Sequence, residues 1–556
     1  MADDAEHKVS TSASKPPSTD NNFSGGMAEP GTGADSDSTT EMVTEQVPAI
    51  ERDTEPKPGN CQTQNSLQTH TKGPKANETI FYRMELTPIE KNAKRDYIRI
   101  MMIMPCPLHS YSGVELKIIT EEVHQAYKKT IGIWPFLAGR FRIVKDDNGG
   151  ESKVELACAR PLRESLIRSQ ISVLEPTSGI VAPPFLDIYG VPSSQYASTL
   201  AALRDHDPET ATSFTPIALK IALVKGVLVL SFAFSNIIFD GEFITNFFRE
   251  FLGFSILVNR QAHARLSFER DMPKITTLGI DEKYEFRCFN WYKTPELEES
   301  TQQVELEFRI FKLNALNVHD LFSKLRSVAS RVKSKNSPMM QDSIFALFWV
   351  LITRVRTEYG LLEYSAWARA NIMVPGHLAT KGRHDNDPYY YGNSTATAVA
   401  SCKVTELVGP ADEWPFFDRP FSTKLGRLTH AGCLIRKARR EINKGYMSKL
   451  YGLKQAIGPA EDQQAQDRAL RPHAGNVIFE DWTKYGADLE CHFSYLEEDR
   501  QPRFVPCMTG LKEGTVIILP RKNEEFGDHD WNICVCLGKG ALERVDELLK
   551  DEGWAG

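Results

Sequence analysis

Two apolar segments followed directly by an amphipathic one place the strongest restriction on the fold of this chain. The stretch "FTPIALKIALVKGVLVLSFAFSNIIFDG" (214–241) predicts two strands on either side of Lys225 and Gly226, and residues 242–256 have apolar side chains at helical spacing. Strands this apolar are typical of a buried sheet, and the helix that follows indicates an α/β fold. The longest apolar run, 226–239, has 14 residues and is too short to span a bilayer.

The mixture of strands and helices recurs later in the chain, which predicts two α/β domains. The 556 residues are enough for two or more domains. Residues 1–77 are rich in Ser, Thr, Gly, Pro and acidic residues, with Phe23 as the only aromatic residue, and we predict a disordered tail there. The predicted domains are 78–275 and 303–556, joined by a polar crossover linker at 276–302.

A capping signal marks the first helix after the tail. In "LTPIE" (86–90), Thr87 suits the N-cap, Pro88 the first helical position and Glu90 the third. The spacing therefore predicts a short helix that begins at Pro88.

Charge and cysteine content exclude several classes of protein. The net charge of −7 gives no driving force for binding nucleic acid or anionic membranes. The ten cysteines include no Cys-x-x-Cys pair and no zinc-site spacing, so we expect buried free thiols and no metal. The acidic start "MADDAEHK" has no apolar signal region, and we expect a cytoplasmic protein.

Seven segments follow one another in an order that matches a known family. They are "LTPIE" (86–90), "WPFLAGRFR" (134–142), "SNIIFDG" (235–241), "SIFALFWVLITRVR" (343–356), "ARANIMVP" (368–375), "YYYGN" (389–393) and "EDWTKYGADLE" (480–490). Their order resembles that of the BAHD-type acyltransferases of fungi and plants, which include trichothecene 3-O-acetyltransferase-like enzymes. The collinear order is more specific than any single segment, because chance matches would not align.

The resemblance implies two domains similar to chloramphenicol acetyltransferase, each a mixed sheet with flanking helices, and a channel between them. It also implies transfer of an acyl group from acyl-CoA, a thioester co-substrate, onto a hydroxyl or amine of a small secondary metabolite. No bound cofactor is expected, and the family suggests a monomer.

The segment "SNIIFDG" departs from the family where the chemistry would occur. In the family, the His of His-His-x-x-x-Asp-Gly is the general base, whereas this chain has Ser235 and Asn236 at the two His positions. None of the 13 histidines begins a His-x-x-x-Asp pattern. Asn236 either orients a nucleophile or an oxyanion, or bonds its own backbone in a turn.

Two residues of the same segment match the family. Asp240 and Gly241 are kept. The resemblance implies that Asp240 fixes the loop and that Gly241 permits close packing. Asp240 would serve as a base only if it turned inward, where burial raises the pKa of a carboxyl group.

Further landmarks are also altered. Asp488 matches the first residue of the family's structural Asp-Phe-Gly-Trp-Gly loop, but Leu-Glu-Cys follows at 489–491. On a later strand, Arg369 matches the first of two arginines and Asn371 replaces the second. We expect Arg369 and Asn371, together with His492, to border the channel for the acyl donor and the substrate.

Other polar residues near these landmarks are weaker candidates. His492, four residues after Asp488, is the displaced histidine of most interest, while His473 and His377 lie near other landmarks. A histidine in such a place more often has a surface or packing role than a catalytic one. Glu480 and Asp481 are adjacent, and because neighbouring strand residues face opposite sides, paired-carboxylate catalysis is not expected there.

Three functions remain open after the sequence. The first is an acyltransferase with an atypical site. The second is another enzyme on the same scaffold, such as a cyclase or isomerase, and the third is an inactive protein that binds a metabolite. Fold alone does not decide among them.

Overall fold

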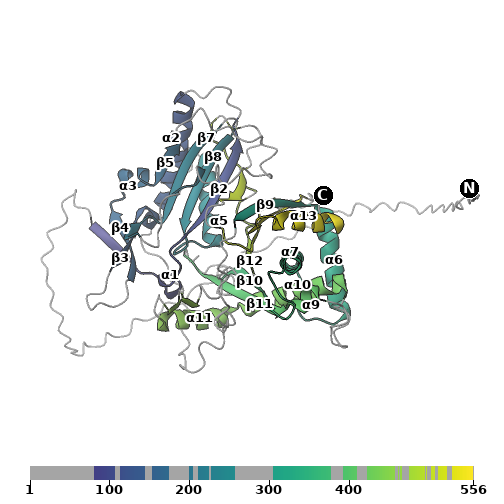
Figure 1. The fold of residues 1–556 in the computed structure, drawn as a ribbon. Coiled ribbons are helices and arrows are strands. Elements are labelled where there is room, and N and C mark those ends of the chain that lie inside the picture. The colour runs from purple at the N-terminus through teal and green to yellow at the C-terminus, as the bar shows by residue number, and fades with distance from the viewer. Residues whose placement is uncertain are drawn as a thin grey trace, which may run out of the picture. The chain divides into compact units, whose positions relative to one another are not determined.

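The computed structural model describes segments of the chain between residues 80 and 554, all within one unit, Pro74–Gly556 (Figure 1). The predicted linker at 276–302 lies outside the described residues, as do the predicted tail at 1–77, His377 and His473. The described segments are 80–106, 113–144, 153–174, 200–203, 211–224, 227–256, 305–376, 392–409, 423–457, 461–462, 464–465, 475–486, 488–494, 496, 502–507, 511–522 and 529–554.

The two apolar segments predicted in 214–241 form neighbouring antiparallel strands, β7 and β8, within a five-stranded sheet. All nine residues of β8 are buried. The order is β13-β2-β8-β7-β5, in which β5 runs parallel to β7 and the other pairs are antiparallel. The strands are β2 (Tyr97–Pro105), β5 (Ile171–Leu174), β7 (Ile217–Val224), β8 (Val227–Ser235) and β13 (Arg503–Pro506).

Aromatic packing fixes the helix that follows β8. In α5 (Gly241–Ile256), the ring of Phe247 lies 5.9 Å from that of Phe232 and 5.4 Å from that of Phe234, both in β8. The ring of Tyr127, from α2 (Gly113–Ile133), lies 6.3 Å from that of Phe247. Because the helix is held against the strand that precedes it, the turn between them has a fixed position.

A smaller antiparallel sheet carries the segment "WPFLAGR". Its order is β1-β4-β3-β6, and a short 3-10 helix, Pro135–Ala138, precedes β3. A Cβ at Gly139 would lie 2.7 Å from the carbonyl oxygen of Ala157, so a side chain does not fit there. The strands are β1 (Ile80–Met84), β3 (Arg140–Val144), β4 (Lys153–Arg160) and β6 (Ser213–Phe214), and α3 (Glu164–Arg168) follows β4.

The capping signal predicted in "LTPIE" is confirmed. Helix α1 (Pro88–Lys91) begins at Pro88, and the backbone N–H of Glu90 donates to Oγ1 of Thr87 (3.2 Å). The Glu90 carboxylate in turn accepts from the backbone N–H of Thr87 (2.9 Å).

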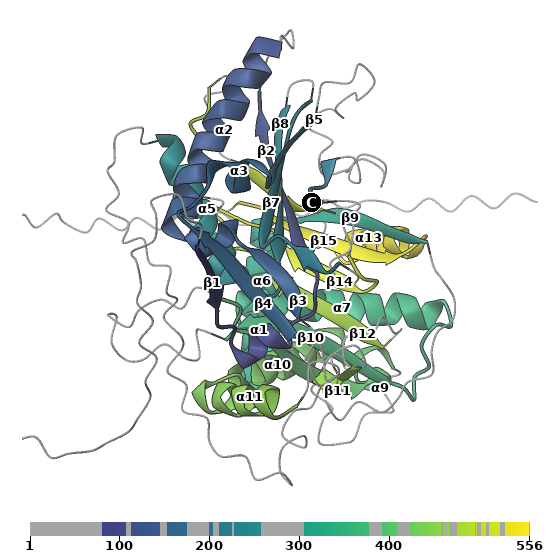
Figure 2. The same ribbon diagram turned by 90° about the vertical axis from the view of Figure 1, so that its left-hand side faces the viewer.

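The second large sheet lies in the later half of the chain and has six strands (Figure 2). Its order is β11-β10-β12-β14-β15-β9, in which β12 runs parallel to β10 and β14 while the other pairs are antiparallel. The strands are β9 (Leu306–Leu313), β10 (Trp367–Pro375), β11 (Thr395–Lys403), β12 (Asn476–Asp481), β14 (Thr515–Ile518) and β15 (Trp531–Gly538).

Helix α7 forms the centre of the second core. Its Phe345 ring lies 4.6 Å from Phe479 of β12, and Trp349 is fully buried. Within the described segments, no helix is both long and apolar enough to traverse a membrane. The helices of this half are α6 (Ala315–Arg331), α7 (Met340–Glu358), α9 (Val404–Val408), α10 (Lys424–Glu441), α11 (Lys444–Ala456) and α13 (Ala541–Asp551).

One strand of the later half completes the first sheet. β13 pairs with β2, so that Phe504 lies opposite Met102. The Phe504 ring also lies 5.0 Å from Phe248 of α5. This strand crosses the domain division predicted at 303 and joins the two halves through main-chain hydrogen bonds and aromatic packing.

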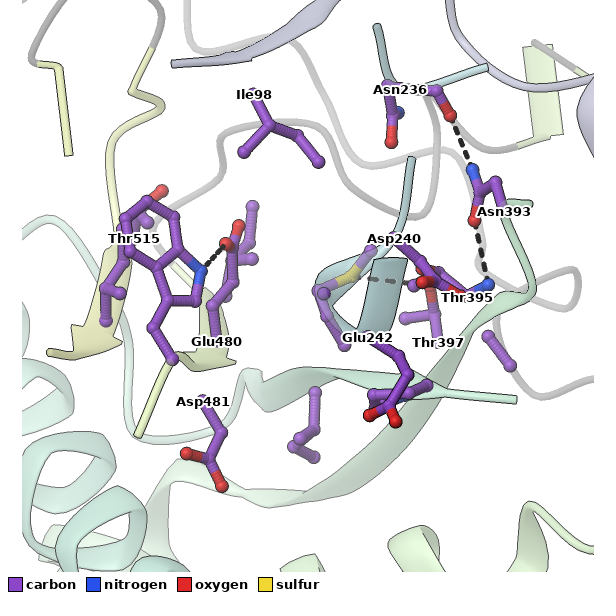
Figure 3. A pocket seen from close by; sticks show the side chains of 18 of the residues that line it. Ile98, Asn236, Asp240, Glu242, Asn393, Thr395, Thr397, Glu480, Asp481 and Thr515 are labelled. Atoms are coloured by element: carbon purple, nitrogen blue, oxygen red, sulfur yellow. Dashed lines mark hydrogen bonds between the residues drawn. The ribbon is translucent and has the colours of Figure 1, made fainter. Parts of the chain in front are cut away.

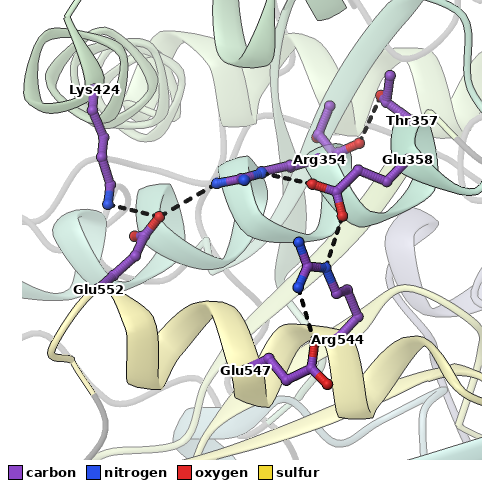
Figure 4. Close-up of polar contacts among 8 residues, drawn as sticks. Arg354, Thr357, Glu358, Lys424, Arg544, Glu547 and Glu552 are labelled. Carbon is purple, nitrogen blue, oxygen red and sulfur yellow. Dashed lines mark hydrogen bonds and ion pairs between the residues drawn. The ribbon is translucent and has the colours of Figure 1, made fainter. Parts of the chain in front are cut away.

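A network of charged side chains joins three helices of the later half (Figure 4). Glu358 of α7 pairs with Arg354 and with Arg544 of α13, each at 2.8 Å. Glu552 pairs with Lys424 of α10 (2.7 Å) and with Arg354 (3.7 Å). Glu552 is the partly buried member, because its side chain is only 8% exposed.

Substituting Glu552→Gln is expected to lower the free energy of unfolding by about 1 kcal/mol, because a shielded carboxylate loses two cationic partners. Chemical denaturation measures the change. Glu547→Gln is the matched control: its side chain is 62% exposed and pairs with Arg544, so its loss should stay within about 0.5 kcal/mol. Equal losses in the two variants would contradict the importance of burial.

Candidate active site

The segment "SNIIFDG" forms the turn between β8 and α5. Ser235 ends β8 and is fully buried. Its carbonyl oxygen accepts from the backbone N–H groups of Ile238 (3.2 Å) and Phe239 (3.0 Å), and its Oγ accepts from the N–H of Ile237 (3.4 Å). Both oxygens of Ser235 therefore stabilise the turn itself.

The backbone of Asn236 is held from both sides of the turn. Its N–H donates to the carbonyl of Asp96 (2.9 Å), and its carbonyl accepts from Nδ2 of Asn393 (2.5 Å). Figure 3 shows that the side-chain amide takes no part in the bond to Asn393 and lies on the wall of a cavity. Asn236 thus presents an amide where the sequence resemblance implies an imidazole.

Asn393 joins three of the segments that the sequence resemblance singled out. Besides its bond to Asn236, its backbone N–H donates to Oε1 of Glu90 (3.2 Å), the capping residue of α1. The segments "LTPIE" and "SNIIFDG" therefore meet at Asn393, the last residue of "YYYGN", although Asn393 and Asn236 are 157 residues apart in the chain.

Both carboxylate oxygens of Asp240 accept structural hydrogen bonds. Its Oδ1 accepts from the backbone N–H of Phe243 (2.9 Å) in the first turn of α5. Its Oδ2 accepts from the backbone N–H (3.1 Å) and the hydroxyl (2.9 Å) of Ser394 in the later half. The buried carboxylate thus caps a helix and ties the two halves together.

Gly241 permits close approach of an aromatic side chain. A Cβ at this position would lie 2.5 Å from Oη of Tyr485 and 3.0 Å from its Cε1. Tyr485 is buried and stacks on Trp482, with ring centroids 5.2 Å apart and an angle of 20° between the planes. The glycine therefore lets the segment 482–485 reach the start of α5.

The turn borders a cavity of about 500 Å³ that residues of both halves line. Asn236, Asp240 and Glu242 come from the turn and α5, while Thr395 and Thr397 come from β11 (Figure 3). Glu480, Asp481 and Thr515 lie on the opposite wall. A cavity of this volume can enclose a small organic molecule.

Glu480 is a half-buried carboxylate on this wall. Its Oε2 accepts a hydrogen bond from Nε1 of Trp482 (2.9 Å). Removal from water raises the pKa of Glu480 above its ordinary value, although the Trp482 bond and the charge of Lys512 oppose that shift.

Strand alternation predicts opposite faces for Glu480 and Asp481, yet both border the cavity. The reason is that β12 ends at Asp481, where the backbone turns. Asp481 accepts from the N–H (3.1 Å) and the hydroxyl (2.6 Å) of Thr483, so its carboxylate fixes the following turn. The two carboxylates thus have different partners.

Five of the predicted site residues are not among the residues that line the cavity: the buried Ser235 described above, and Arg369, Asn371, Asp488 and His492. Arg369 and Asn371 lie on β10, where Asn371 is buried and burial lowers the pKa of the Arg369 guanidinium. Asp488 is exposed. The Nε2 of His492 lies 3.3 Å from a carboxylate oxygen of Glu490.

Several cationic side chains also border the cavity. Lys454 pairs with the buried carboxylate of Asp462, and Arg439 pairs with that of Asp342 (2.7 Å). Lys94, Lys484 and Lys512 add further positive charge. In the part of the chain that the structure describes, no cluster of three or more His, Cys, Asp and Glu side chains is arranged to hold a metal ion.

Known structures match the fold over most of the chain, although no family model and no curated protein matches the sequence. TRI101 of F. graminearum, complexed with coenzyme A and deoxynivalenol, has a TM-score of 0.61 at 14% identity, covering 85% of this chain and 98% of that chain. TRI101 of F. sporotrichioides, complexed with coenzyme A and T-2, has a TM-score of 0.60 at 14% identity with the same coverage.

A third match is TRI3, a trichothecene 15-O-acetyltransferase from Fusarium sporotrichioides. Its TM-score is 0.55 at 13% identity, covering 86% of this chain and 97% of that chain. The chain therefore has the fold of the two-domain, chloramphenicol acetyltransferase-like acyltransferases, with two mixed sheets flanked by helices, as predicted.

Reasoning from the sequence missed two parts of the site. The first is the set of hydrogen bonds that Asn393 and Ser394 donate to the turn, since "YYYGN" resembled the family without indicating a partner. The second is Glu480, which adjoins Trp482 in a matched segment and was set aside because strand alternation disfavoured a carboxylate pair. The signal available for Glu480 was an acidic residue at the end of an apolar strand.

Proposed function

We propose that this protein is an acyltransferase that moves an acyl group from an acyl-CoA thioester onto a hydroxyl or amine of a small metabolite. The observation that carries the proposal is the cavity between the halves, which the turn 235–241 borders in a fold that it shares with acetyltransferases. TRI101 was solved with coenzyme A and a small mycotoxin in complex, which supports the same two kinds of ligand here.

The proposed reaction needs three things from the protein. The thioester carbonyl and the acceptor must be held together, which by itself contributes several kcal/mol. The oxyanion of the tetrahedral intermediate must also be stabilised. We assign the side-chain N–H of Asn236 (Nδ2) as its hydrogen-bond donor, and such a donor contributes about 3 kcal/mol. The lysines at the cavity supply positive charge for the phosphates of CoA.

Purified protein is expected to bind acetyl-CoA in calorimetry and to release free CoA thiol in the presence of an acceptor. The acceptors are a panel of primary amines and alcohols small enough for the cavity, including deoxynivalenol. Thr397→Trp, which fills the cavity, should remove turnover. Leu316→Trp, at an exposed site on α6, should leave it unchanged.

Two outcomes would contradict the proposal. The first is no binding of CoA or acetyl-CoA by correctly folded protein, which would favour a non-catalytic role or a different reaction on this scaffold. The second is a reaction that consumes a metabolite without a thioester, which would favour a cyclase or isomerase.

A further inference from the structure

The cavity contains a carboxylate that the related family's mechanism does not use. Glu480 lies near the end of β12, across the cavity from Asn236 (Figure 3). The two side chains come from different halves of the chain. A proton acceptor at Glu480 would therefore face the same bound reactants as the amide at Asn236, but from the opposite wall.

The carboxylate is held in a defined orientation. The indole N–H of Trp482 donates to Oε2 (2.9 Å), and Trp482 is itself fixed by its stack on Tyr485. Among the described residues, Trp482 is the hydrogen-bond partner of the Glu480 carboxylate. The other oxygen, Oε1, is thus left to contact a ligand in the cavity.

Two titratable neighbours of Glu480 carry no charge near neutral pH. Burial raises the pKa of Tyr485 and of Cys534, so both remain neutral there. Lys512 lowers the pKa of Glu480, and exclusion of water outweighs it. The charged and titratable groups close to Glu480 or to its neighbour Tyr485 are Lys512, Asp481, Tyr485, Cys534, Asp240 and Glu242.

We propose that Glu480 is the general base of the acyl transfer, replacing the histidine that is absent at position 236. This inference rests on the proposed function. The base stands on the opposite wall from the position that the sequence resemblance implied, and Asn236 keeps the complementary task of stabilising the oxyanion.

Oε1 of Glu480 accepts the proton of the acceptor O–H or N–H while that oxygen or nitrogen bonds to the thioester carbonyl carbon. The tetrahedral intermediate collapses, the C–S bond breaks, and the proton passes from Glu480 to the CoA thiolate. The products are an ester or amide and free CoA, and the carboxylate is regenerated.

Glu480→Gln is expected to lower kcat by about 10²–10⁴-fold, because that is the usual contribution of a general base. Acetyl-CoA binding by calorimetry should change by less than about threefold. The assay uses the full chain, acetyl-CoA, and the amine or alcohol that the wild type acylates. Glu543→Gln, an exposed site paired with Arg309 on the protein surface, is the matched control and should match the wild type.

The pH dependence separates a base from a structural carboxylate. Since Glu480 must be ionised to accept a proton, kcat/KM of the wild type should rise as pH passes through a pKa above the ordinary value of glutamate. That limb should vanish in Glu480→Gln. In Glu480→Gln combined with Asn236→His, part of the activity should return with a limb near the pKa of histidine, about 6.5.

Stability gives a readout that does not depend on turnover. The folded state raises the pKa of Glu480, so it binds the proton more tightly than the unfolded state does. Stability from this group is therefore present below the ordinary glutamate pKa and is lost as pH rises through the raised pKa. The Tm of Glu480→Gln should therefore be higher than that of the wild type at neutral pH and equal to it at acidic pH.

The outcomes distinguish this inference from the function beneath it. A wild type that neither binds acetyl-CoA nor releases thiol overturns both. If the wild type transfers the acyl group and Glu480→Gln keeps both the kcat and the pH dependence of kcat/KM, Glu480 is not the base, and the proposed function still stands. A rise in acceptor KM at unchanged kcat likewise overturns it, because the carboxylate would then only bind the acceptor.

Discussion

Replacing Asp240 with alanine is expected to lower the free energy of unfolding by about 3–5 kcal/mol and to abolish acyl transfer. The substitution removes the cap of α5 and leaves the N–H and hydroxyl of Ser394 without their acceptor. Loss of a cap costs about 0.5–2 kcal/mol, and each buried donor left unsatisfied adds about 1–3 kcal/mol. The turn that carries Asn236 loses these two bonds to the later half and keeps the one from Asn393, so the cavity wall shifts.

Chemical denaturation and the thiol-release assay measure the two effects. Ser394→Ala is the graded control, because it removes only the hydroxyl bond and should lower stability by about 1 kcal/mol. An Asp240→Ala protein as stable as the wild type would show that the carboxylate does not join the halves. An inactive but fully stable variant would instead place Asp240 in the chemistry.

Gly241→Ala is expected to destabilise the protein by about 1–3 kcal/mol, although alanine ordinarily favours a helix. The new methyl group would lie 2.5 Å from Oη of Tyr485, and the stack on Trp482 limits how far that ring can move. Any movement also shifts the indole that orients Glu480, so kcat should fall together with stability. Thermal melting and the thiol assay follow both.

Gly253→Ala in the same helix is the matched control. Among the described residues, no atom beyond the adjacent residues and the helix's own backbone lies within 4 Å of a Cβ there, so the substitution should stabilise the protein by about 0.5–1 kcal/mol. Adding Tyr485→Phe to Gly241→Ala removes the nearest atom and should recover part of the loss. If the two glycine variants behave alike, steric contact with Tyr485 is not what position 241 must avoid.

Much of the fold followed from local patterns that the sequence displays directly. The capping box of Thr87 and Glu90 spans four residues, so its partners are visible in the sequence and the helix begins where predicted. The strands β7 and β8 were predictable because their apolar runs are long and adjacent. These features depend on side chains a few residues apart, whose relative positions secondary structure already fixes.

The site was less predictable because its contacts are non-local. The bond from Asn393 to the Asn236 carbonyl and the pairing of β13 with β2 both join residues that are far apart in the chain. Alternation along β12 also gave an incomplete prediction for Glu480 and Asp481, since it cannot indicate where the strand ends.

The sequence by itself determined the class of fold, the turn between β8 and α5, and the absence of a histidine at position 236. The tertiary structure decided that the Asp240 carboxylate bonds Ser394 of the later half. It also decided that Arg369, Asn371 and His492 do not line the cavity, whereas Glu480 does. The physical reason is that hydrophobic periodicity specifies which faces are buried. The meeting of two polar side chains across a cavity depends instead on how the two sheets pack.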